Sequence, residues 1–459
     1  MYKTIQKIHF VGIGGIGMSG LAEILMNLGY RVSGSDIKRT PITNRLRRRG
    51  VKVFYQHKMQ NVDGAQVVVT SSAISRQNPE VLEAVRHHIP VVARAEILAE
   101  LMRLKYGVAV AGTHGKTTTT SLIAAVLEEG GFDPTVVVGG RVRSLRSNAR
   151  LGKGEFLVAE ADESDGSFLK LSPTIAVVTT IDPEHMDYYR DFAKVKRTFA
   201  EFCAKVPFYG LVVWGIDHPV VRTLAHQFQK RSLTYSLGGK IAADLTATHL
   251  THKENQSEAL IHFHGKKLGR LKLQIPGRHN VSNALAAIAV GLELGIPYTK
   301  IARALRRFKG ISRRMEILYQ DKNTLVMDDY GHHPEEIKAT LRAVKEGWGR
   351  KTIVIFQPHR YSRTRDLFDS FRTAFGLADQ VILTDIYAAS EEPIRGITGE
   401  RLARAIKNPN VLYEPDFGKI IDLTKQRVGA YGHTPRLILT LGAGDIWKVG
   451  REIARQLEH

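Results

Sequence analysis

Two glycine-rich turns in this sequence have residue types and spacings suited to binding phosphate. In the first, "VGIGGIGMSG", Gly12, Gly14 and Gly17 satisfy the pattern G-x-G-x-x-G, and Asp36 follows 19 positions after Gly17. Glycine N–H groups at the start of a helix hold a pyrophosphate, and such a carboxylate binds a ribose hydroxyl. The turn therefore predicts a site for a dinucleotide, or for a UDP-sugar, which also carries a pyrophosphate and a ribose.

The second turn, in "VAVAGTHGKTTTT", departs from the usual phosphate-loop pattern G-x-x-x-x-G-K-[ST]. Val110 stands where the first glycine is expected, and the nearest glycine is Gly112. The N–H groups of the turn and of the following helix would still face one anion, with Lys116 as a mobile cation. The hydroxyl of Thr117 would bind Mg²⁺. The stretch predicts a shortened loop for the phosphates of ATP.

Acidic residues and a histidine follow this loop at the ends of two apolar stretches. "LVAEADESDGSF" places Glu160, Asp162, Glu163 and Asp165 after a buried strand, and "TTIDPEHMDYY" places His185 after another. A divalent cation that bridges phosphates is held by carboxylates at the carboxyl end of a parallel strand, and neutral imidazole is a common ligand. The two stretches predict a metal site; the alternatives are an acidic turn and a structural histidine.

The two turns together narrow the function. A dehydrogenase needs the first turn and has no use for the second, and a simple ATPase needs only the second. An enzyme that holds a nucleotide-linked substrate in one domain and ATP in the next needs both.

The elements that must position these residues alternate between strand and helix. Such alternation over residues 1–106 predicts a parallel sheet with helices on its faces. It resumes with "YGVAVAGT", "EFLVAEAD" and "TIAVVTTID", gives way to a Thr- and His-rich region expected to be antiparallel at 233–276, and resumes again after "FKGISRRMEIL". "GRHNVSNALAAIAVGLELG" predicts a strong helix. We expect three α/β domains, at residues 1–106, 107–310 and 311–459.

The length and composition limit the classes of protein to which the chain can belong. The chain has 459 residues, 43% hydrophobic and 24% charged, which suits two to four globular domains. No apolar run approaches the roughly 18 residues of a membrane helix, and the N-terminus has no cleavable hydrophobic region. Cys203 is the single cysteine, which fits a reducing compartment. These features predict a cytoplasmic protein without a membrane partner.

The formal net charge of +21 favours a solvated basic surface over a dedicated nucleic-acid face. The basic residues are spread out, with short clusters such as "RLRRRG", and no basic tail or zinc spacing accompanies them. We expect no nucleic-acid partner. Local help in holding anionic substrates is a further possibility for this charge.

Seven ordered motifs give the whole chain a family resemblance. "GTHGKTTTT", "EADESDGSF", "DPEHMDYY", "GRHNVSNALAA", "SRRMEI", "DDYGHHPEEI" and "QPHRYSRT" resemble those of the Mur ligases, ATP-dependent amide-forming enzymes of peptidoglycan precursor synthesis. "GIGGIGMSGLAEIL" and "HRYSRT" narrow the resemblance to the branch that adds L-alanine to UDP-N-acetylmuramate. The resemblance implies a Rossmann-like N-terminal domain for the UDP-sugar, a central P-loop ATP-binding domain with an antiparallel portion, and a Rossmann-like C-terminal domain for the amino acid.

The resemblance also implies roles for matching residues. Those implied for the UDP-sugar are Gly14, Gly15, Gly17, Asp36, Ser71 and Ser72. Those implied for ATP are Gly112, Thr113, His114, Gly115, Lys116, Thr117, Thr118, Asn280, Asn283, Arg314 and Asp328. Thr117, Glu160 and His185 are the implied ligands of two Mg²⁺ ions, and Tyr330, His332, His359, Arg360 and Arg363 those around the alanine and the reacting carboxylate. Lys116, His185, His332 and Arg360 are the expected catalytic residues.

The implied reaction passes through an acyl phosphate. The γ-phosphoryl group of ATP is first transferred to the sugar carboxylate, and the alanine amine then displaces phosphate, with His332 as the expected base. Both steps gather negative charge on oxygens, which Lys116, two Mg²⁺ ions and the arginines would stabilise. The alternative within the family is a recycling ligase that joins a pre-made murein peptide to the same UDP-sugar. A monomer or a dimer is expected.

The sequence departs from the family pattern at a few points. Gly331 replaces the alanine of D-D-Y-A-H-H-P, a small change. Many relatives bridge their metals with a carbamylated lysine, for which Lys194 and Lys196 are equally placed here. The strong basicity is unusual for the family, and the sequence does not explain it.

Overall fold

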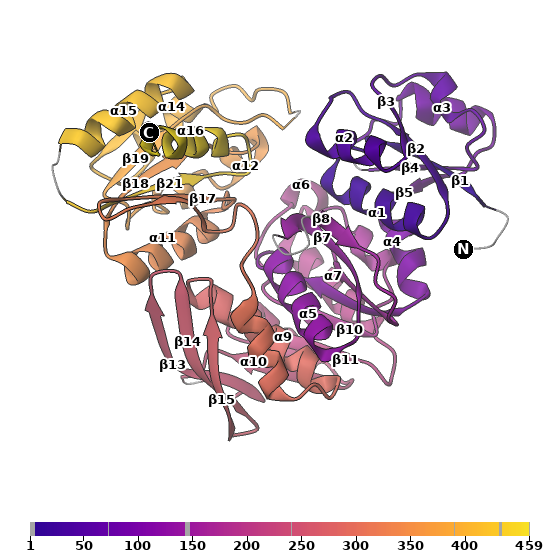
Figure 1. Ribbon diagram of the computed structural model, residues 1–459, viewed down its shortest axis with the longest axis horizontal. Helices are drawn as coiled ribbons and strands as arrows, with labels where there is room; N and C mark the ends of the chain where they lie inside the picture. Colours follow the sequence, from indigo (N-terminus) through magenta and orange to yellow (C-terminus); the bar gives the residue numbers. More distant parts are fainter. Residues whose placement is uncertain are drawn as a thin grey trace. The chain divides into compact units, whose positions relative to one another are not determined.

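The computed structural model describes residues 5–71, 73–142, 147–239, 241–389, 391–430 and 434–458. Its helices and strands build three α/β domains around three separate sheets, which confirms the predicted fold class (Figure 1). By internal contacts the chain divides into two compact units. One comprises residues 1–249, 259–271 and 281–308, and the other comprises 250–258, 272–280 and 309–459. The boundaries expected at 106/107 and 310/311 stay predictions.

The N-terminal sheet is five-stranded and parallel, in the order β3-β2-β1-β4-β5. Its strands are β1 (Lys7–Val11), β2 (Arg31–Ser35), β3 (Lys52–Phe54), β4 (Val67–Thr70) and β5 (Val91–Ala93). The connections hold α1 (Ile16–Asn27), α2 (Pro41–Arg48), the 3₁₀ turn η1 (Met59–Val62), α3 (Pro79–Arg86) and α4 (Arg94–Arg103). The strand order reverses between β1 and β4, which is where open parallel sheets of this kind bind ligands.

The central sheet has ten strands in the order β15-β14-β13-β12-β11-β10-β6-β9-β7-β8. They are β6 (Tyr106–Ala111), β7 (Thr135–Val142), β8 (Ser147–Arg150), β9 (Phe156–Glu160), β10 (Ile175–Val178), β11 (Leu211–Gly215), β12 (Ser232–Ser236), β13 (Leu245–Lys253), β14 (Gln256–Phe263) and β15 (Lys266–Leu273). Its helical segments are α5 (Lys116–Gly130), η2 (Ser167–Lys170), α6 (Met186–Tyr189), α7 (Phe192–Ala204), α8 (Pro219–Gln227), α9 (Arg278–Glu293) and α10 (Tyr298–Arg307).

Strand direction in the central sheet differs from the expectation at one point. The region 233–276 was expected to be antiparallel, yet β12 pairs in parallel with both β11 and β13. An antiparallel pair is present at the other end of the sheet, between β7 and β8. The middle strands β9, β6 and β10 are parallel neighbours, so their carboxyl ends meet at one edge. That edge carries the phosphate loop, the acidic stretch and the segment that leads to His185.

The C-terminal sheet has six strands in the order β16-β17-β21-β18-β19-β20, parallel except for the β16–β17 pair. They are β16 (Glu316–Gln320), β17 (Thr324–Asp329), β18 (Lys351–Phe356), β19 (Gln380–Leu383), β20 (Val411–Tyr413) and β21 (Arg436–Leu441). The helices are α11 (Pro334–Trp348), α12 (Tyr361–Asp366), α13 (Phe368–Arg372), α14 (Gly399–Ala405), α15 (Phe417–Ala430) and α16 (Trp447–Leu457). Helices α11 and α13 pack into one apolar cluster with the sheet, whereas α15 and α16 pack into another.

Across the part of the chain that the structure describes, no helix is both long enough and apolar enough to span a membrane. Buried apolar strands contribute to the cores of the central and C-terminal domains. Strands such as β6, β10, β11 and β18 are almost entirely apolar and buried, as expected for parallel strands covered on both faces.

Candidate functional site

The shortened phosphate loop connects β6 to α5 and depends on its two glycines. Gly112 and Gly115 adopt φ of 136° and 82°, where side chains are strained. A Cβ atom on Gly112 would lie 2.1 Å from the hydroxyl oxygen of Thr179, and one on Gly115 would lie 2.6 Å from Oδ1 of Asn283. Neighbouring segments therefore approach the loop too closely for any other residue, and the missing glycine at Val110 leaves this turn intact.

Lys116, the first residue of α5, turns back over the loop. Its Nζ donates to the carbonyl of Gly112 at 2.6 Å and to Glu163 Oε1 at 2.7 Å. Burial disfavours the charge of Lys116, but the carboxylates of Glu163 and Asp162 outweigh this effect and raise its pKa. Lys116 therefore carries its positive charge at the place where phosphate oxygens would need it.

Thr117 and Glu160, two of the three predicted metal ligands, lie together. The Thr117 side chain hydrogen-bonds to Glu160, and Oε1 of Glu160 accepts from the N–H of Gly139 at 2.5 Å. Burial raises the pKa of the Glu160 carboxyl, against these hydrogen bonds and the charge of Lys116. A hydroxyl and a carboxylate beside a phosphate loop form a suitable oxygen pair for Mg²⁺.

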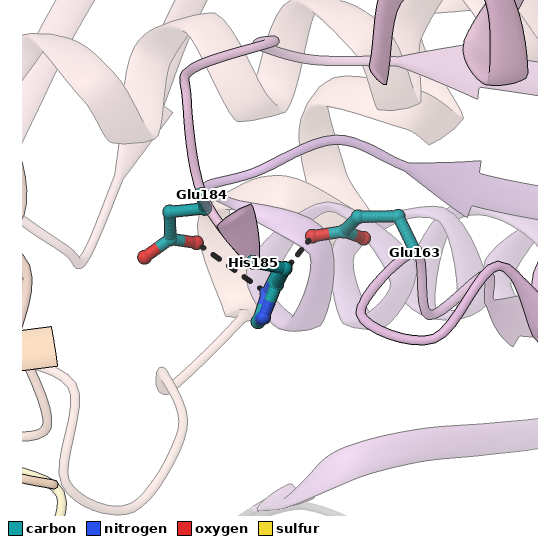
Figure 2. Close-up of side chains that lie close together, drawn as sticks. All are labelled: Glu163, Glu184 and His185. Atoms are coloured by element: carbon teal, nitrogen blue, oxygen red, sulfur yellow. Dashed lines mark ion pairs between the residues drawn. The ribbon is translucent and has the colours of Figure 1, made fainter. Parts of the chain in front are cut away.

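His185, the third predicted ligand, lies instead with Glu163 and Glu184 (Figure 2). Its Nε2 is 3.7 Å from Glu184 Oε2 and 4.0 Å from Glu163 Oε1, and one ligand atom from each residue lies within 4.8 Å of the others. Burial raises the pKa of Glu163 to about 7. The other oxygen of Glu163, Oε2, is buried and accepts no hydrogen bond from any described residue. An unsatisfied buried oxygen in a cluster of this composition fits a divalent cation.

Sequence reasoning placed Glu163 only in the acidic stretch and missed Glu184 as a ligand. The available signal was position, since Glu184 directly precedes His185. It also missed the pairing of His114 in the loop with Asp182, in which Nε2 and Oδ2 are 3.4 Å apart.

The residues predicted to contact adenine lie on α9. Asn280 and Asn283 are both buried, at 7% exposure. Oδ1 of Asn283 accepts from the hydroxyl of Thr119 at 3.1 Å, and Nδ2 of Asn280 donates to the carbonyl of Pro276 at 2.6 Å. Thr118, from the first turn of α5, is also buried. The helix α9 therefore presents one of its predicted amides to the start of α5.

In the N-terminal domain the glycine turn and Asp36 are brought together. The N–H of Gly14 donates to Asp36 Oδ2 at 2.8 Å, and a Cβ on Gly14 would lie 2.6 Å from the same oxygen. Gly15 precedes α1 as its N-cap, and Gly17 faces the guanidinium of Arg94. The residues predicted to bind the UDP-sugar therefore lie together, at the carboxyl ends of β1 and β2 and the start of α1.

Ser71 and Ser72 follow β4, across the point where the strand order reverses. The carbonyl of Ser71 accepts from the N–H of Ile74 at 3.0 Å. Ser72 lies outside the described residues. The position of Ser71 after β4, next to β1 in the sheet, agrees with a place beside the glycine turn.

The C-terminal domain gathers the residues predicted for the amino acid. The rings of Tyr330, His332, His359 and Tyr387 form a row with centroids 5.5, 5.8 and 5.5 Å apart. These residues follow β17, β18 and β19, whose carboxyl ends share one edge. Tyr387 was missed, because its sequence neighbours carry no motif.

Two arginines that were predicted to surround the alanine and the reacting carboxylate follow β18 and so lie at the same edge of the C-terminal sheet. Arg363 Nη1 donates to Nδ1 of His359 at 3.2 Å. Burial and the neighbouring His332 and Arg363 lower the pKa of His359 to about 3, so this ring is neutral near pH 7. Arg360 adopts φ 73° and ψ 138°, a conformation that side chains rarely take and that occurs preferentially at functional sites.

Asp328 pairs with Arg313, the residue that precedes the predicted Arg314. Asp328 Oδ2 accepts from Nε of Arg313 at 3.0 Å, and Arg313 also donates to the carbonyl of Gly442 at 2.6 Å. Arg314 lies 3.5 Å from Glu336, and its guanidinium is 5.3 Å from the centre of the Tyr330 ring. Arg313, which was not predicted, binds Asp328, and both Arg313 and Arg314 lie over the ring of Tyr330.

The chain is similar to known proteins along nearly its whole length. Three family models match in succession: the "Mur ligase family, catalytic domain" over residues 7–106, the "Mur ligase middle domain" over 110–291, and the "Mur ligase, glutamate ligase domain" over 313–444. The chain is 52% identical to a UDP-N-acetylmuramate–L-alanine ligase from Syntrophotalea carbinolica, covering 100% of this chain and 99% of that one. It is 50% identical to the enzyme of the same name from Geobacter sulfurreducens, with the same coverage.

Solved structures show the same fold. The UDP-N-acetylmuramate–alanine ligase of Thermotoga maritima is 30% identical, with a TM-score of 0.83 and coverage of 98% of this chain and 99% of that one. A murein peptide ligase from Psychrobacter arcticus, 24% identical with a TM-score of 0.71 and 98% coverage of both chains, is similar in fold.

Proposed function

The chain belongs to the Mur ligase family, and on this premise we propose that it joins L-alanine to the carboxylate of UDP-N-acetylmuramate at the expense of ATP, in peptidoglycan precursor synthesis. The observation that carries this proposal is the edge of the central sheet, where Lys116, Glu163 and His185 meet beside a strained glycine loop. The full-length identity to alanine-adding ligases supports L-alanine as the amino acid.

ATP is the substrate assigned to the central domain. Its phosphates would lie against the N–H groups of residues 112–118, with Lys116 close to the transferred phosphoryl group. Asn280 and Asn283 on α9 would hold the adenine, and Arg314 and Asp328 complete the proposed ATP residues. A MurF ligase from Thermotoga maritima has a related fold, and its structure has been solved in complex with ADP.

Two Mg²⁺ ions fit the oxygen and imidazole groups at this edge. Thr117 and Glu160 would hold one, and His185, with Glu163 and Glu184, would hold the other. When bound, the ions neutralise charge on the phosphate oxygens. The ammonium groups of Lys194 and Lys196 lie over the rings of Tyr188 and Phe192, respectively, and these contacts with described residues do not single out either lysine as a carbamylated ligand.

The UDP-sugar is assigned to the N-terminal domain. The N–H groups of Gly14, Gly15 and Gly17 would hold its pyrophosphate, and Asp36 its ribose. Asp36 accepts from Gly14 in this structure, so ribose binding would replace or share that hydrogen bond. Ser71 and Ser72 would lie nearby.

The amino acid is assigned to the edge of the C-terminal sheet. Arg360 and Arg363 would supply positive charge for carboxylate groups, next to Tyr330, His332 and His359. His332 suits the role of base better than His359. Nδ1 of His332 lies 3.0 Å from the carbonyl of Tyr330 and can only donate to it, so the lone pair of the neutral ring is on Nε2. His359 instead accepts from Arg363 through Nδ1 and has a pKa of about 3.

The proposed reaction has two steps: phosphoryl transfer to the sugar carboxylate, and attack of the amine on the resulting acyl phosphate. A carboxylate oxygen of the sugar attacks the γ-phosphorus of ATP, the bond to the β–γ bridging oxygen breaks, and ADP leaves. The ammonium group of L-alanine loses one proton to His332, and the resulting amine attacks the acyl carbon. The nitrogen then loses a second proton to the phosphate, which leaves with the original carboxylate oxygen. Lys116 and Arg360 stabilise the negative charge that gathers on these oxygens.

The proposal also includes the cellular compartment, the partners and the oligomeric state of the enzyme. ATP and UDP-sugars are cytoplasmic metabolites, so we place the enzyme in the cytoplasm. We expect small-molecule partners only, no nucleic acid, and a monomer or a dimer. The domains proposed to bind the UDP-sugar, ATP and amino acid are residues 1–106, 107–310 and 311–459.

The test measures phosphate release from ATP and Mg²⁺ with UDP-N-acetylmuramate, with and without L-alanine, at physiological salt. Release that requires both the sugar and L-alanine supports the proposal. Release with a murein peptide and none with L-alanine would replace it with the recycling ligase. Tight NAD binding without phosphate release would instead favour a dehydrogenase.

A further inference from the structure

The carboxylate of Asp182, next to the phosphate loop, contacts one histidine through each of its two oxygens. Its Oδ2 is 3.4 Å from Nε2 of His114, and its Oδ1 is 3.1 Å from Nε2 of His218. All three side chains are about one-fifth exposed. His114 belongs to the loop itself, whereas His218 comes from the turn between β11 and α8. The carboxylate thus connects the loop to a strand two positions away in the sheet.

The same segment is hydrogen-bonded to the first half of the loop. The N–H of Asp182 donates to the hydroxyl of Thr113 at 2.8 Å, and the N–H of His114 donates to the hydroxyl of Thr180 at 3.0 Å. The hydroxyl of Thr179 donates to the carbonyl of His114 at 2.5 Å. Residues 179–182 therefore fix both the backbone and the His114 side chain of the loop.

His218 also takes part in this arrangement, although it lies in none of the sequence motifs that indicated the family. It is the N-cap residue of α8, and its Nε2 faces Asp182. Its other ring nitrogen, Nδ1, is buried and makes no hydrogen bond to a described residue. The hydrogen bond to Asp182 is thus the polar interaction that this ring makes within the described chain, and Nε2 must carry the proton to donate it.

We propose that His218 is a positioning residue for the ATP phosphates. By holding Asp182, it keeps His114 and the adjoining N–H groups of the loop in the geometry that binds phosphate. A loop that binds through backbone N–H groups is sensitive to displacements of about 1 Å, because several hydrogen bonds lengthen together. The inference rests on the proposed ATP site and adds to it a residue that touches neither ATP nor its metal.

The experiment compares three substitutions in the full-length protein. His218→Leu removes the donor, whereas His218→Gln keeps an N–H near the position of Nε2. His226→Leu is the matched control, because His226 is an exposed histidine on the same helix, α8. The Kd of ATP is measured by calorimetry, and that of adenosine, which lacks phosphates, by ligand-observed NMR.

We expect His218→Leu to weaken ATP binding about tenfold and to leave adenosine binding unchanged, since only phosphate contacts are displaced. His218→Gln should restore most of the affinity, and His226→Leu should bind like the unaltered protein. In turnover, His218→Leu should raise KM for ATP and leave KM for the UDP-sugar unchanged.

Three outcomes would overturn the inference: unchanged ATP affinity in His218→Leu, equal weakening of ATP and adenosine, or equal weakening by His226→Leu. If His218→Leu does not fold, Asp182→Asn takes its place, with the same selective loss of ATP affinity expected and its absence contradicting the inference. Failure of the unaltered protein to bind ATP is a distinct result, which would overturn the proposed function itself.

Discussion

Lys116 and Glu163 form a largely buried ion pair, with Nζ and Oε1 2.7 Å apart, although 47 residues separate them in the sequence. The pair joins the end of β6 to the end of β9, neighbouring parallel strands. ATP phosphates would offer Lys116 another anion, and Glu163 would then be available to a cation. The pair therefore connects the loop proposed to bind phosphate with the residues proposed to bind metal.

Replacing Lys116 with methionine should abolish ligation and destabilise the fold. The substitution removes the cation beside the transferred phosphoryl group and leaves Glu163 buried without its partner, which costs about 3 kcal/mol. Chemical denaturation measures the stability, and phosphate release measures the activity. The double variant Lys116→Met/Glu163→Gln should regain stability without activity. Normal turnover in either variant would refute the assignment of the loop.

The cluster of Glu163, Glu184 and His185 should determine the magnesium requirement. Glu184→Gln and His185→Ala should each raise the Mg²⁺ concentration for half-maximal turnover by about tenfold or more, because the first removes the negative charge of a ligand and the second removes an imidazole ligand. Magnesium titrations of turnover measure this, and Mn²⁺ binding without substrates provides an independent reading. Glu201→Gln, at an exposed position on α7, is the control. A magnesium dependence identical in all variants would contradict the metal assignment.

Glu80 should make stability depend on pH. It is fully buried, which by itself raises its pKa, but the neighbouring His9 and hydrogen bonds from Ser35 and Asn61 outweigh this desolvation and lower the pKa from 4.5 to about 2. The folded state thus binds this proton more weakly than the unfolded state. The contribution is complete above pH 4.5, amounts to about 3 kcal/mol, and is lost as pH falls towards 2.

Urea denaturation of Glu80→Gln tests this dependence. Its loss of stability relative to the unaltered protein should shrink by more than half between pH 7 and pH 3. Glu83→Gln, on the same helix α3 but paired at the surface with His87, serves as the control and should show little change. A loss of stability for Glu80→Gln that is the same at both pH values would show that the carboxylate has no special role.

Cys203 should not react in the folded protein. It is 0% exposed on α7, and burial raises the pKa of its thiol, so neither access nor the reactive thiolate is provided. A disulfide reagent at pH 8 should therefore detect no thiol in the native state and one thiol in guanidinium chloride. Rapid reaction of the native protein would mean that α7 opens readily.

Local patterns predicted much of the fold. Helix α9 lies within the stretch that helix signals indicated, α5 follows the phosphate loop as expected, and the apolar strands β6, β9 and β10 are where their composition placed them. Both glycine turns connect a strand to a helix as expected. These features depend on neighbouring residues, which a single sequence displays directly.

The features that the sequence did not reveal depend on contacts between distant segments. Alternating polarity identified strands in 233–276, but the parallel pairing of β12 depends on how the chain crosses between strands. His218 meets Asp182 because the carboxyl ends of the parallel strands β10 and β11 share an edge, and Arg313 meets Asp328 because the start of β16 pairs with the end of β17. Nothing in the residues beside His218 or Tyr387 distinguishes them from surface residues.

The most direct test of the proposed reaction follows an oxygen atom. UDP-N-acetylmuramate labelled with ¹⁸O in its carboxylate is incubated with ATP, Mg²⁺ and L-alanine, and the phosphate and the sugar product are analysed by mass spectrometry. The acyl-phosphate reaction predicts one ¹⁸O in each phosphate released and one retained in the new amide, with L-alanine required for both. Phosphate free of ¹⁸O, or released without formation of the alanyl product, would contradict the account.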